Sequence, residues 1–158
     1  MIHSIDKMSV CIGLILVTLF PVLTHASGNE QKPVALDSSY VKECGSCHVP
    51  YLPRHLNAAS WNQMLHGLES HFNVDASLDE TTLPVISAYL NAHARKKPTN
   101  DAEGKPVIRI SQTSWFLHEH DDLLETPAPK VKSLSKCDAC HTQASTGRYS
   151  ESEIKIPK

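Results

Sequence analysis

The chain has 158 residues, with 15 lysine and arginine against 17 aspartate and glutamate side chains, so its formal net charge is −2. This length suits one compact domain or two very small ones. So small a charge, with no long basic run, argues against nucleic acid as a partner.

The N-terminal segment predicts export. Residues 10–23 are almost wholly apolar and follow a short head that contains Lys7. They lead to Thr24-His25-Ala26, which resembles a signal peptidase site. The apolar run is shorter than the roughly 20 residues of a transmembrane helix. We therefore predict a signal peptide over residues 1–26, cleaved after Ala26, and an exported protein; an uncleaved N-terminal anchor is the alternative.

Apolar periodicity predicts three helices in the first half of the exported chain. Residues 37–48 form a short helix, and two prolines make residues 49–53 an irregular loop. Ser60 opens the clearest helix, because Gln63 completes a capping box with it. The apolar stripe of this helix comprises Trp61, Met64, Leu65, Leu68 and Phe72. The next helix covers residues 82–94, with Leu83, Ile86 and Leu90 facing inward.

The composition changes abruptly over residues 95–106, where Lys, Pro, Asn, Asp and Gly replace apolar residues. This is the best internal boundary. We therefore expect an N-terminal region (27–97), a linker (98–106) and a C-terminal region (107–158). In the last, residues 107–110 are briefly extended, and a helix over residues 114–125 is ended by the proline-rich residues 126–129. The predicted fold is mainly α, with little or no sheet.

Cysteine spacing indicates a cofactor. Cys11 leaves with the signal peptide, and the four other cysteines form two C-x-x-C pairs, each followed directly by histidine. The pentads are Cys44-Gly45-Ser46-Cys47-His48 and Cys137-Asp138-Ala139-Cys140-His141. In a c-type site, two thiols add to the vinyl groups of one haem and the next histidine binds the iron. The pattern therefore predicts two covalently attached haem c groups, bound by the four cysteines, with His48 and His141 as proximal iron ligands.

Three other interpretations of the pentads lack support in the sequence. A disulfide framework has no need of a histidine after each pair. Thioredoxin-like redox chemistry would place one C-x-x-C in a βαβ pattern, which is not found. A single zinc site built from four cysteines would leave both histidines unused. Haem attachment uses both cysteines and the histidine of each pentad.

Haem would also supply apolar surface that so short a chain lacks. Regions of fewer than roughly 70 residues rarely build a sufficient core alone. We expect Trp61, Phe72, Trp115 and Phe116 to pack around the porphyrins, in a small cytochrome c-like helical fold organised around the two haems. The apoprotein is accordingly predicted to fold poorly.

The second axial ligand of each iron separates an electron carrier from a ligand-binding or catalytic haem. Met64 is the only methionine beyond the signal peptide, so histidine–methionine coordination at both haems is impossible. Helical spacing puts His71 at the edge of the apolar stripe and His120 among apolar neighbours, while His66 and His118 point to solvent. The expected distal ligands are therefore His71 and His120, with His93 and Met64 as alternatives. His55 follows His48 too closely to reach the opposite face of the same haem.

With these residues in place, the chain resembles the small diheme cytochrome c family known as DHC, from about Tyr40 to Pro157. The residues that carry the resemblance are both pentads, Ser60-Trp61, Leu68, His71-Phe72, Asp75-Ala76-Ser77-Leu78, Tyr89-Leu90, Trp115-Phe116 and His120. The resemblance implies a periplasmic carrier of low potential with bis-histidine haems. It also implies redox partners such as a membrane cytochrome b561 and an oxygen-binding monohaem cytochrome. His118 departs from the pattern, in which a basic residue is expected.

Three functions follow as hypotheses. The first is a diheme single-electron carrier that is not an enzyme, because spare inward-facing histidines exist in both halves. The second is a haem enzyme or a gas-binding sensor in which one iron keeps an open axial site. The third is a haem module that serves as a docking subunit of a larger oxidoreductase.

Overall fold

The computed structural model describes residues 35–126 and 130–157, so the predicted signal peptide lies outside the described residues. The α-helices are α1 (Ser38–Cys44), α2 (Ala58–His66), α3 (Thr82–His93), α4 (Ser114–Glu119) and α5 (Asp121–Glu125). Short 3₁₀ turns lie at Pro53–His55, Leu68–Ser70, Ile110–Gln112, Cys137–Ala139, Ala144–Thr146 and Glu151–Glu153. The described part of the chain contains isolated β-bridges but no strand. The predicted mainly α fold is confirmed.

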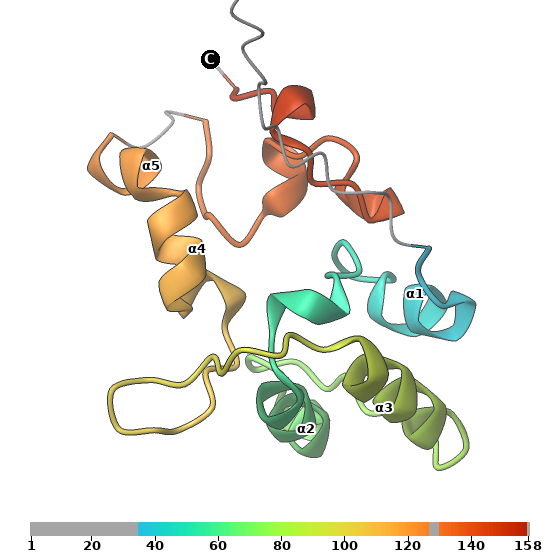
Figure 1. Ribbon diagram of the computed structural model, residues 1–158. Helices are drawn as coiled ribbons and strands as arrows, with labels where there is room; N and C mark the ends of the chain where they lie inside the picture. The colour runs from blue at the N-terminus through green and yellow to red at the C-terminus, as the bar shows by residue number, and fades with distance from the viewer. Residues whose placement is uncertain (1–34, 127–129, 158) are drawn as a thin grey trace, which may run out of the picture.

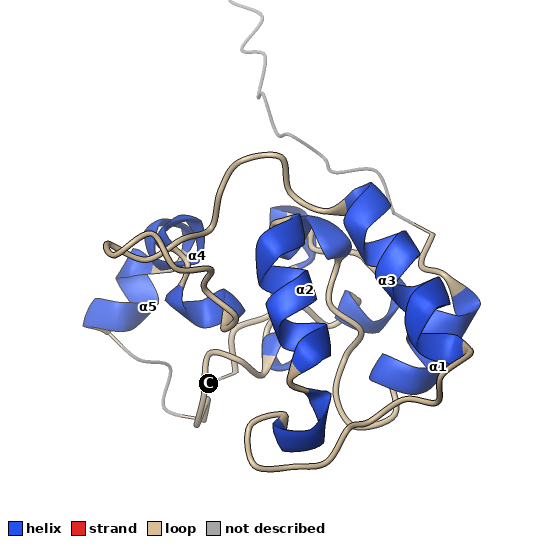
Figure 2. Ribbon diagram, turned by 90° about the horizontal axis from the view of Figure 1, so that it is seen from below, coloured by secondary structure: helices blue, strands red, loops and turns tan. Residues whose placement is uncertain are grey.

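The helices form two groups. In Figures 1 and 2, α1, α2 and α3 lie together, and α4 and α5 lie apart from them on the other side of the molecule. The C-terminal segment, red in Figure 1, lies between the two groups. None of the helices in the described ranges is long and apolar enough to cross a bilayer.

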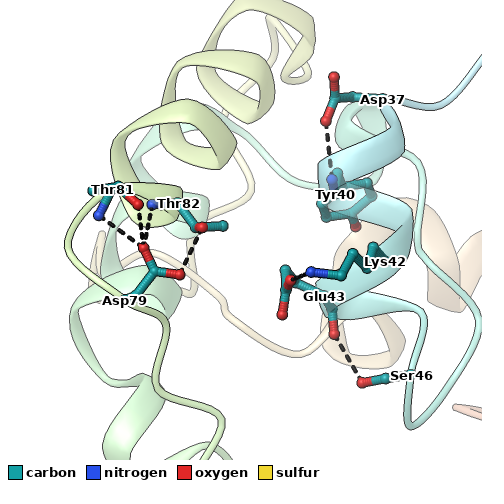
Figure 3. Close-up of polar contacts among 8 residues, drawn as sticks. All are labelled: Asp37, Tyr40, Lys42, Glu43, Ser46, Asp79, Thr81 and Thr82. Carbon is teal, nitrogen blue, oxygen red and sulfur yellow. Dashed lines mark hydrogen bonds and ion pairs between the residues drawn. The ribbon is translucent and has the colours of Figure 1, made fainter.

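Side-chain caps explain where the first three helices begin. The Asp37 carboxylate accepts a hydrogen bond from the Tyr40 amide at the start of α1, and Asn57 accepts one from the Ser60 amide at the start of α2. Before α3, the Asp79 carboxylate accepts hydrogen bonds from the amides and hydroxyls of Thr81 and Thr82 (Figure 3). Each cap satisfies amides that would otherwise lack a partner at a helix end.

The capping residue of α2 corrects the sequence prediction. Asn57, rather than Ser60, is the N-cap, and the helix begins at Ala58. Ser60 is instead buried inside the first turn, where its hydroxyl lies 3.0 Å from the hydroxyl of Thr99. A tertiary hydrogen bond therefore uses the side chain that the capping-box pattern had assigned to the helix end.

The hydrophobic core belongs to the first group of helices. Its buried members are Tyr40, Leu56, Trp61, Ile86, Leu90 and Ala94. Two hydrogen bonds hold aromatic side chains there. The Trp61 indole donates to the carbonyl of Pro53 at 2.7 Å, and the Tyr40 hydroxyl donates to that of Tyr51 at 2.7 Å. The loop that contains the paired prolines is therefore packed against the core.

Two predicted helices end earlier than the periodicity indicated. Helix α2 ends at His66, and a 3₁₀ turn over Leu68–Ser70 follows, so His71 and Phe72 lie beyond the helix. The helix predicted over residues 114–125 is divided into α4 and α5 at His120, whose φ of −128° is not helical. Residues 107–110 form no strand. Both expected distal ligands thus lie at helix interruptions rather than on helix faces.

Several hydrogen bonds cross the predicted boundary between the two regions. Thr99, inside the expected linker, is buried and bonds to Ser60. The Trp115 indole donates to the carbonyl of His55 at 3.1 Å, and the Tyr51 hydroxyl donates to that of Ser135 at 2.8 Å. The division at residues 98–106 remains a prediction, but the regions on either side of it contact each other.

Candidate functional site

The first pentad continues directly from helix α1, whose last residue is Cys44. The Gly45 amide donates to the Val41 carbonyl and closes the helix end. A Cβ at Gly45 would come too close to that same carbonyl oxygen, so a glycine is required at this position. Helix α1 is therefore shorter than the helix predicted over residues 37–48, and the chain turns between the two cysteines.

The second pentad is built on a 3₁₀ turn, Cys137–Ala139, rather than on an α-helix. The His141 amide donates to the Cys137 carbonyl at 2.8 Å and closes the turn around both cysteines. The C-terminal segment then folds back, because the Lys155 amide donates to the Cys140 carbonyl at 3.0 Å. A bridge between His141 and Ile154 strengthens the same contact.

The four cysteines of the pentads form no disulfide bond with one another. Burial raises the pKa of Cys44 and that of Cys137 to about 11, so both stay protonated at neutral pH. Thiolate redox chemistry needs the opposite shift. Within residues 35–126 and 130–157, no three His, Cys, Asp or Glu side chains gather closely enough to hold a metal ion, as a four-cysteine zinc site would require.

The structure brings His71 opposite His48. Their ring centroids are 6.2 Å apart and their planes differ by 30°. The His48 Nδ1 lies 2.8 Å from the Val49 carbonyl, which leaves Nε2 free. His71 is presented by a tight turn in which Phe72 and Asn73 both have positive φ, 49° and 72°. For a bulky residue such as Phe72 this backbone conformation is unusual.

The structure brings His120 opposite His141 in the second region. Their ring centroids are also 6.2 Å apart, but their planes differ by 68°. The His120 Nδ1 lies 2.9 Å from the Phe116 carbonyl, and the Phe116 ring stacks on the imidazole at 4.0 Å. These two contacts hold the His120 ring at the junction of α4 and α5.

The separation within each histidine pair fits an iron ion held between two imidazoles. With metal–nitrogen bonds of about 2.0 Å, two imidazoles on opposite sides of one metal have ring centres roughly 6 Å apart. Burial lowers the pKa of both His71 and His141, which favours the neutral form that binds metals. Each pair also includes the histidine that directly follows two cysteines in the chain. The residues present therefore fit two haem groups attached through thioethers.

The other candidate ligands lie elsewhere. His93 is exposed at the end of α3, and its Nδ1 lies 2.9 Å from the Tyr89 carbonyl. Met64 packs against the hydrophobic core. His66 and His118 are exposed, as predicted. Among the ring contacts found in the described residues, none joins His66, His93 or His118 to His48 or His141.

The aromatic residues expected around porphyrins divide into two sets. Phe72 and Phe116 lie against His71 and His120, with ring centroids 4.7 Å and 4.0 Å away. Trp61 belongs to the hydrophobic core. Trp115 lies 5.5 Å from the His55 ring, and the Arg95 guanidinium lies over its indole at 5.4 Å.

Sequence reasoning missed an aromatic cluster between the two pentads, made of Tyr51, His55 and Tyr149. Tyr51 stacks on His48 at 4.8 Å, and Tyr149 lies 5.2 Å from His141. His55 contacts both tyrosines. Burial, with a smaller contribution from Arg54, lowers the pKa of His55 to about 3, so it is neutral. No periodic pattern in the sequence marks these residues, because they meet only through the tertiary fold.

Comparisons with known proteins show the family of this chain. A family model described as dihaem cytochrome c matches residues 40–149. A crystal structure of the diheme cytochrome c from Shewanella baltica OS155 is 32% identical, covers 76% of this chain and 92% of that one, and has a TM-score of 0.62. No curated protein matches the chain.

Two structures from Rhodobacter sphaeroides are also similar. The crystal structure of DHC is 38% identical, with a TM-score of 0.60, and covers 73% of this chain and all of that one (100%). A second structure, of a diheme cytochrome c from that organism, is 34% identical, with a TM-score of 0.65, and covers 73% of this chain and 98% of that one. The chain therefore belongs to the dihaem cytochrome c family and carries two haem c groups.

Proposed function

We propose that the protein is a single-electron carrier in which both irons are bound by two histidines. One haem would be attached through Cys44 and Cys47, with His48 and His71 as axial ligands. The other would be attached through Cys137 and Cys140, with His141 and His120 as axial ligands. The observation that carries the proposal is the 6.2 Å separation of the rings in both histidine pairs.

The ligand set favours electron transfer over catalysis. When bound, haem iron supplies one-electron chemistry by alternating between its ferric and ferrous states. His71 and His120 would close the axial positions that an enzyme or a gas sensor keeps open. Two imidazole ligands also give a lower reduction potential than one imidazole and one methionine. The protein would therefore exchange electrons without binding a substrate at iron.

The test is to replace each distal histidine singly. We expect the wild-type holoprotein to have low-spin ferric iron at both sites and to be insensitive to carbon monoxide after reduction. In His71→Ala and in His120→Ala, one haem of the two becomes high-spin and binds carbon monoxide. Optical and electron paramagnetic resonance (EPR) spectra report both changes.

Matched controls are available close to each ligand. His66→Ala and His118→Ala remove exposed histidines five and two residues away, and we expect their spectra to remain those of the wild type. His93→Ala and Met64→Leu test the alternative ligands in the same way. A wild-type protein with a high-spin fraction that binds carbon monoxide would favour the haem enzyme or sensor instead.

Export and partners are part of the proposal. The signal-like residues 1–26 and the family resemblance support a periplasmic carrier that works between a membrane cytochrome, such as a b561, and a soluble partner such as a monohaem cytochrome. N-terminal sequencing of the periplasmic holoprotein should begin at Ser27. Retention in the membrane with residues 1–26 attached would contradict cleavage. Stopped-flow mixing with a reduced b-type cytochrome and an oxidised monohaem cytochrome would test the partners.

A further inference from the structure

The two haem sites are connected through their proximal sides by the aromatic cluster Tyr51, His55 and Tyr149. The ring centroids of His55 and Tyr149 are 4.9 Å apart in an edge-to-face contact, and those of His55 and Tyr51 are 6.5 Å apart. Each tyrosine in turn contacts one proximal histidine. The environment of each proximal ring is therefore made partly by one tyrosine.

The two proximal histidines differ in what holds them. His48 has a carbonyl partner at its Nδ1, as ligating histidines commonly do. The Nδ1 of His141 is buried and has no hydrogen-bond partner in the described residues. The Tyr149 hydroxyl and the His55 Nδ1 are likewise buried without a partner there. Within the described residues, packing against neighbouring side chains is therefore the contact that can hold the rotation of the His141 ring.

The Tyr149 ring is the group placed to supply that packing. It lies 5.2 Å from the His141 ring, on a segment that backbone contacts hold against the second pentad. These contacts are the bridge between His141 and Ile154 and the hydrogen bond from the Lys155 amide to the Cys140 carbonyl. An ion pair between Arg148 and Glu153 joins two residues within the segment itself. On its other side, the Tyr149 ring meets the buried imidazole of His55 edge-on, at an interplanar angle of 89°.

We propose that Tyr149 is a positioning residue for His141, and that His55 supports Tyr149 from behind. Together they would keep the His141 ring crosswise to the His120 ring. This inference deepens the proposed function and rests on bis-histidine ligation at both sites. It explains why the ring planes differ by 68° at the second site and by only 30° at the first.

The angle between two axial imidazoles has a spectroscopic consequence. Nearly parallel rings separate the energies of the two iron d orbitals that share the unpaired electron, which gives a rhombic low-spin ferric EPR signal. Rings that cross steeply bring these orbitals close in energy, which gives a much more anisotropic signal. The wild-type holoprotein should therefore show one signal of each kind, and the anisotropic one should belong to the second site.

The experiment compares EPR spectra of the oxidised holoprotein in several variants. Tyr149→Leu removes the ring, and we expect the anisotropic signal to move toward the rhombic type while the other signal is unchanged. Tyr149→Phe keeps the ring and should retain the wild-type spectrum. Tyr51→Leu is the matched control, since Tyr51 stacks on His48 and should affect the rhombic signal alone. His55→Leu should shift the same signal as Tyr149→Leu, by a smaller amount.

The outcomes separate this inference from the proposed function. If both low-spin signals are present and neither Tyr149→Leu nor His55→Leu moves the anisotropic one, the positioning role is wrong. If Tyr149→Phe moves it as far as Tyr149→Leu does, the hydroxyl rather than the packed ring is responsible, which also overturns the proposal. A high-spin wild-type spectrum would instead refute bis-histidine ligation itself. If mass spectrometry shows that Tyr149→Leu has lost a haem, the EPR spectrum of His55→Leu decides whether the positioning role is correct.

Discussion

The two haem-binding regions contain the same motif but are built on very different supports. The first pentad extends from α1, which packs with α2 and α3 around six buried residues. In the described part of residues 107–158, the buried hydrophobic side chains are those of Phe116 and Ala144. The second pentad lies on 3₁₀ turns, whose hydrogen-bond geometry is poorer than that of an α-helix. We therefore expect the second region to depend more strongly on its haem for order.

The largest expected effect is a selective loss of structure in the C-terminal region. Replacing Cys137 and Cys140 together by alanine prevents thioether attachment at the second site. Because few apolar contacts remain there, we expect the free energy of local opening over residues 130–157 to fall to about zero. Amide hydrogen exchange measured by mass spectrometry should show this loss, while the amides of α2 and α3 keep their protection.

The reciprocal variant sharpens this comparison. Replacing Cys44 and Cys47 together by alanine removes the first attachment but leaves the hydrophobic core of α2 and α3 in place. We expect these helices to keep partial protection. Equal loss of protection in both regions, from either variant, would show that the two regions order as one unit and that the contrast drawn here is wrong.

A cavity made in the hydrophobic core of the first region should lower the free energy of unfolding by several kilocalories per mole. Leu90 is only 1% exposed in the core, and Leu90→Ala should reduce the free energy of unfolding by about 2–5 kcal/mol. The control is Leu124→Ala in α5, where the side chain is 47% exposed and the expected change is within about 0.5 kcal/mol. Denaturant titration of the holoprotein measures both. Similar costs at the two positions would contradict the location of the core.

The cap of α2 should contribute a smaller amount. Asn57→Ala removes the acceptor of the Ser60 amide, and the expected loss of stability is about 1 kcal/mol. Asn57→Ser retains a capping oxygen and should recover most of it. Thermal unfolding of the wild-type, Asn57→Ala and Asn57→Ser holoproteins measures both differences.

The smallest expected effect is a pH dependence at the start of α3. Hydrogen bonds from the Thr81 and Thr82 side chains and amides lower the pKa of Asp79 below its ordinary value of 3.8. The contribution of Asp79 is therefore fully present above pH 3.8 and is lost as the pH falls toward the lower folded-state pKa. The melting temperature of wild type should exceed that of Asp79→Asn at neutral pH, and the difference should vanish in acid. Glu80→Gln changes the exposed neighbouring side chain and is the control. Its melting temperature should stay close to that of wild type both at neutral pH and in acid.

Much of the helical organisation followed from local patterns. The segment over residues 82–94 was predicted from its apolar period, and α3 occupies Thr82–His93. The prolines near residue 50 correctly predicted an irregular loop. These features depend on backbone restrictions and on short-range periodicity, which are properties of the residues themselves.

The prediction that His71 and His120 are the distal ligands was reached by an argument that the structure does not support. Helical spacing assumed continuous helices through both residues, but α2 ends at His66 and α4 ends at Glu119. The structure still brings these side chains close to the rings of His48 and His141, through a left-handed turn at Phe72 and Asn73 and through the interruption at His120. Periodicity cannot foresee such interruptions, because they are stabilised by contacts with distant segments.

By itself, the sequence determined the chemistry of attachment and the helical class of the fold, because both depend on residues that are neighbours in the chain. The tertiary structure alone decided which histidines face each other, at what angle, and which rings lie between the two sites. In the sequence, Tyr149 is close to His141, whereas His55 is far from both. The fold nevertheless packs the Tyr149 ring between the rings of His141 and His55. Such contacts arise from the packing of segments far apart in the chain, which no local pattern of residues encodes.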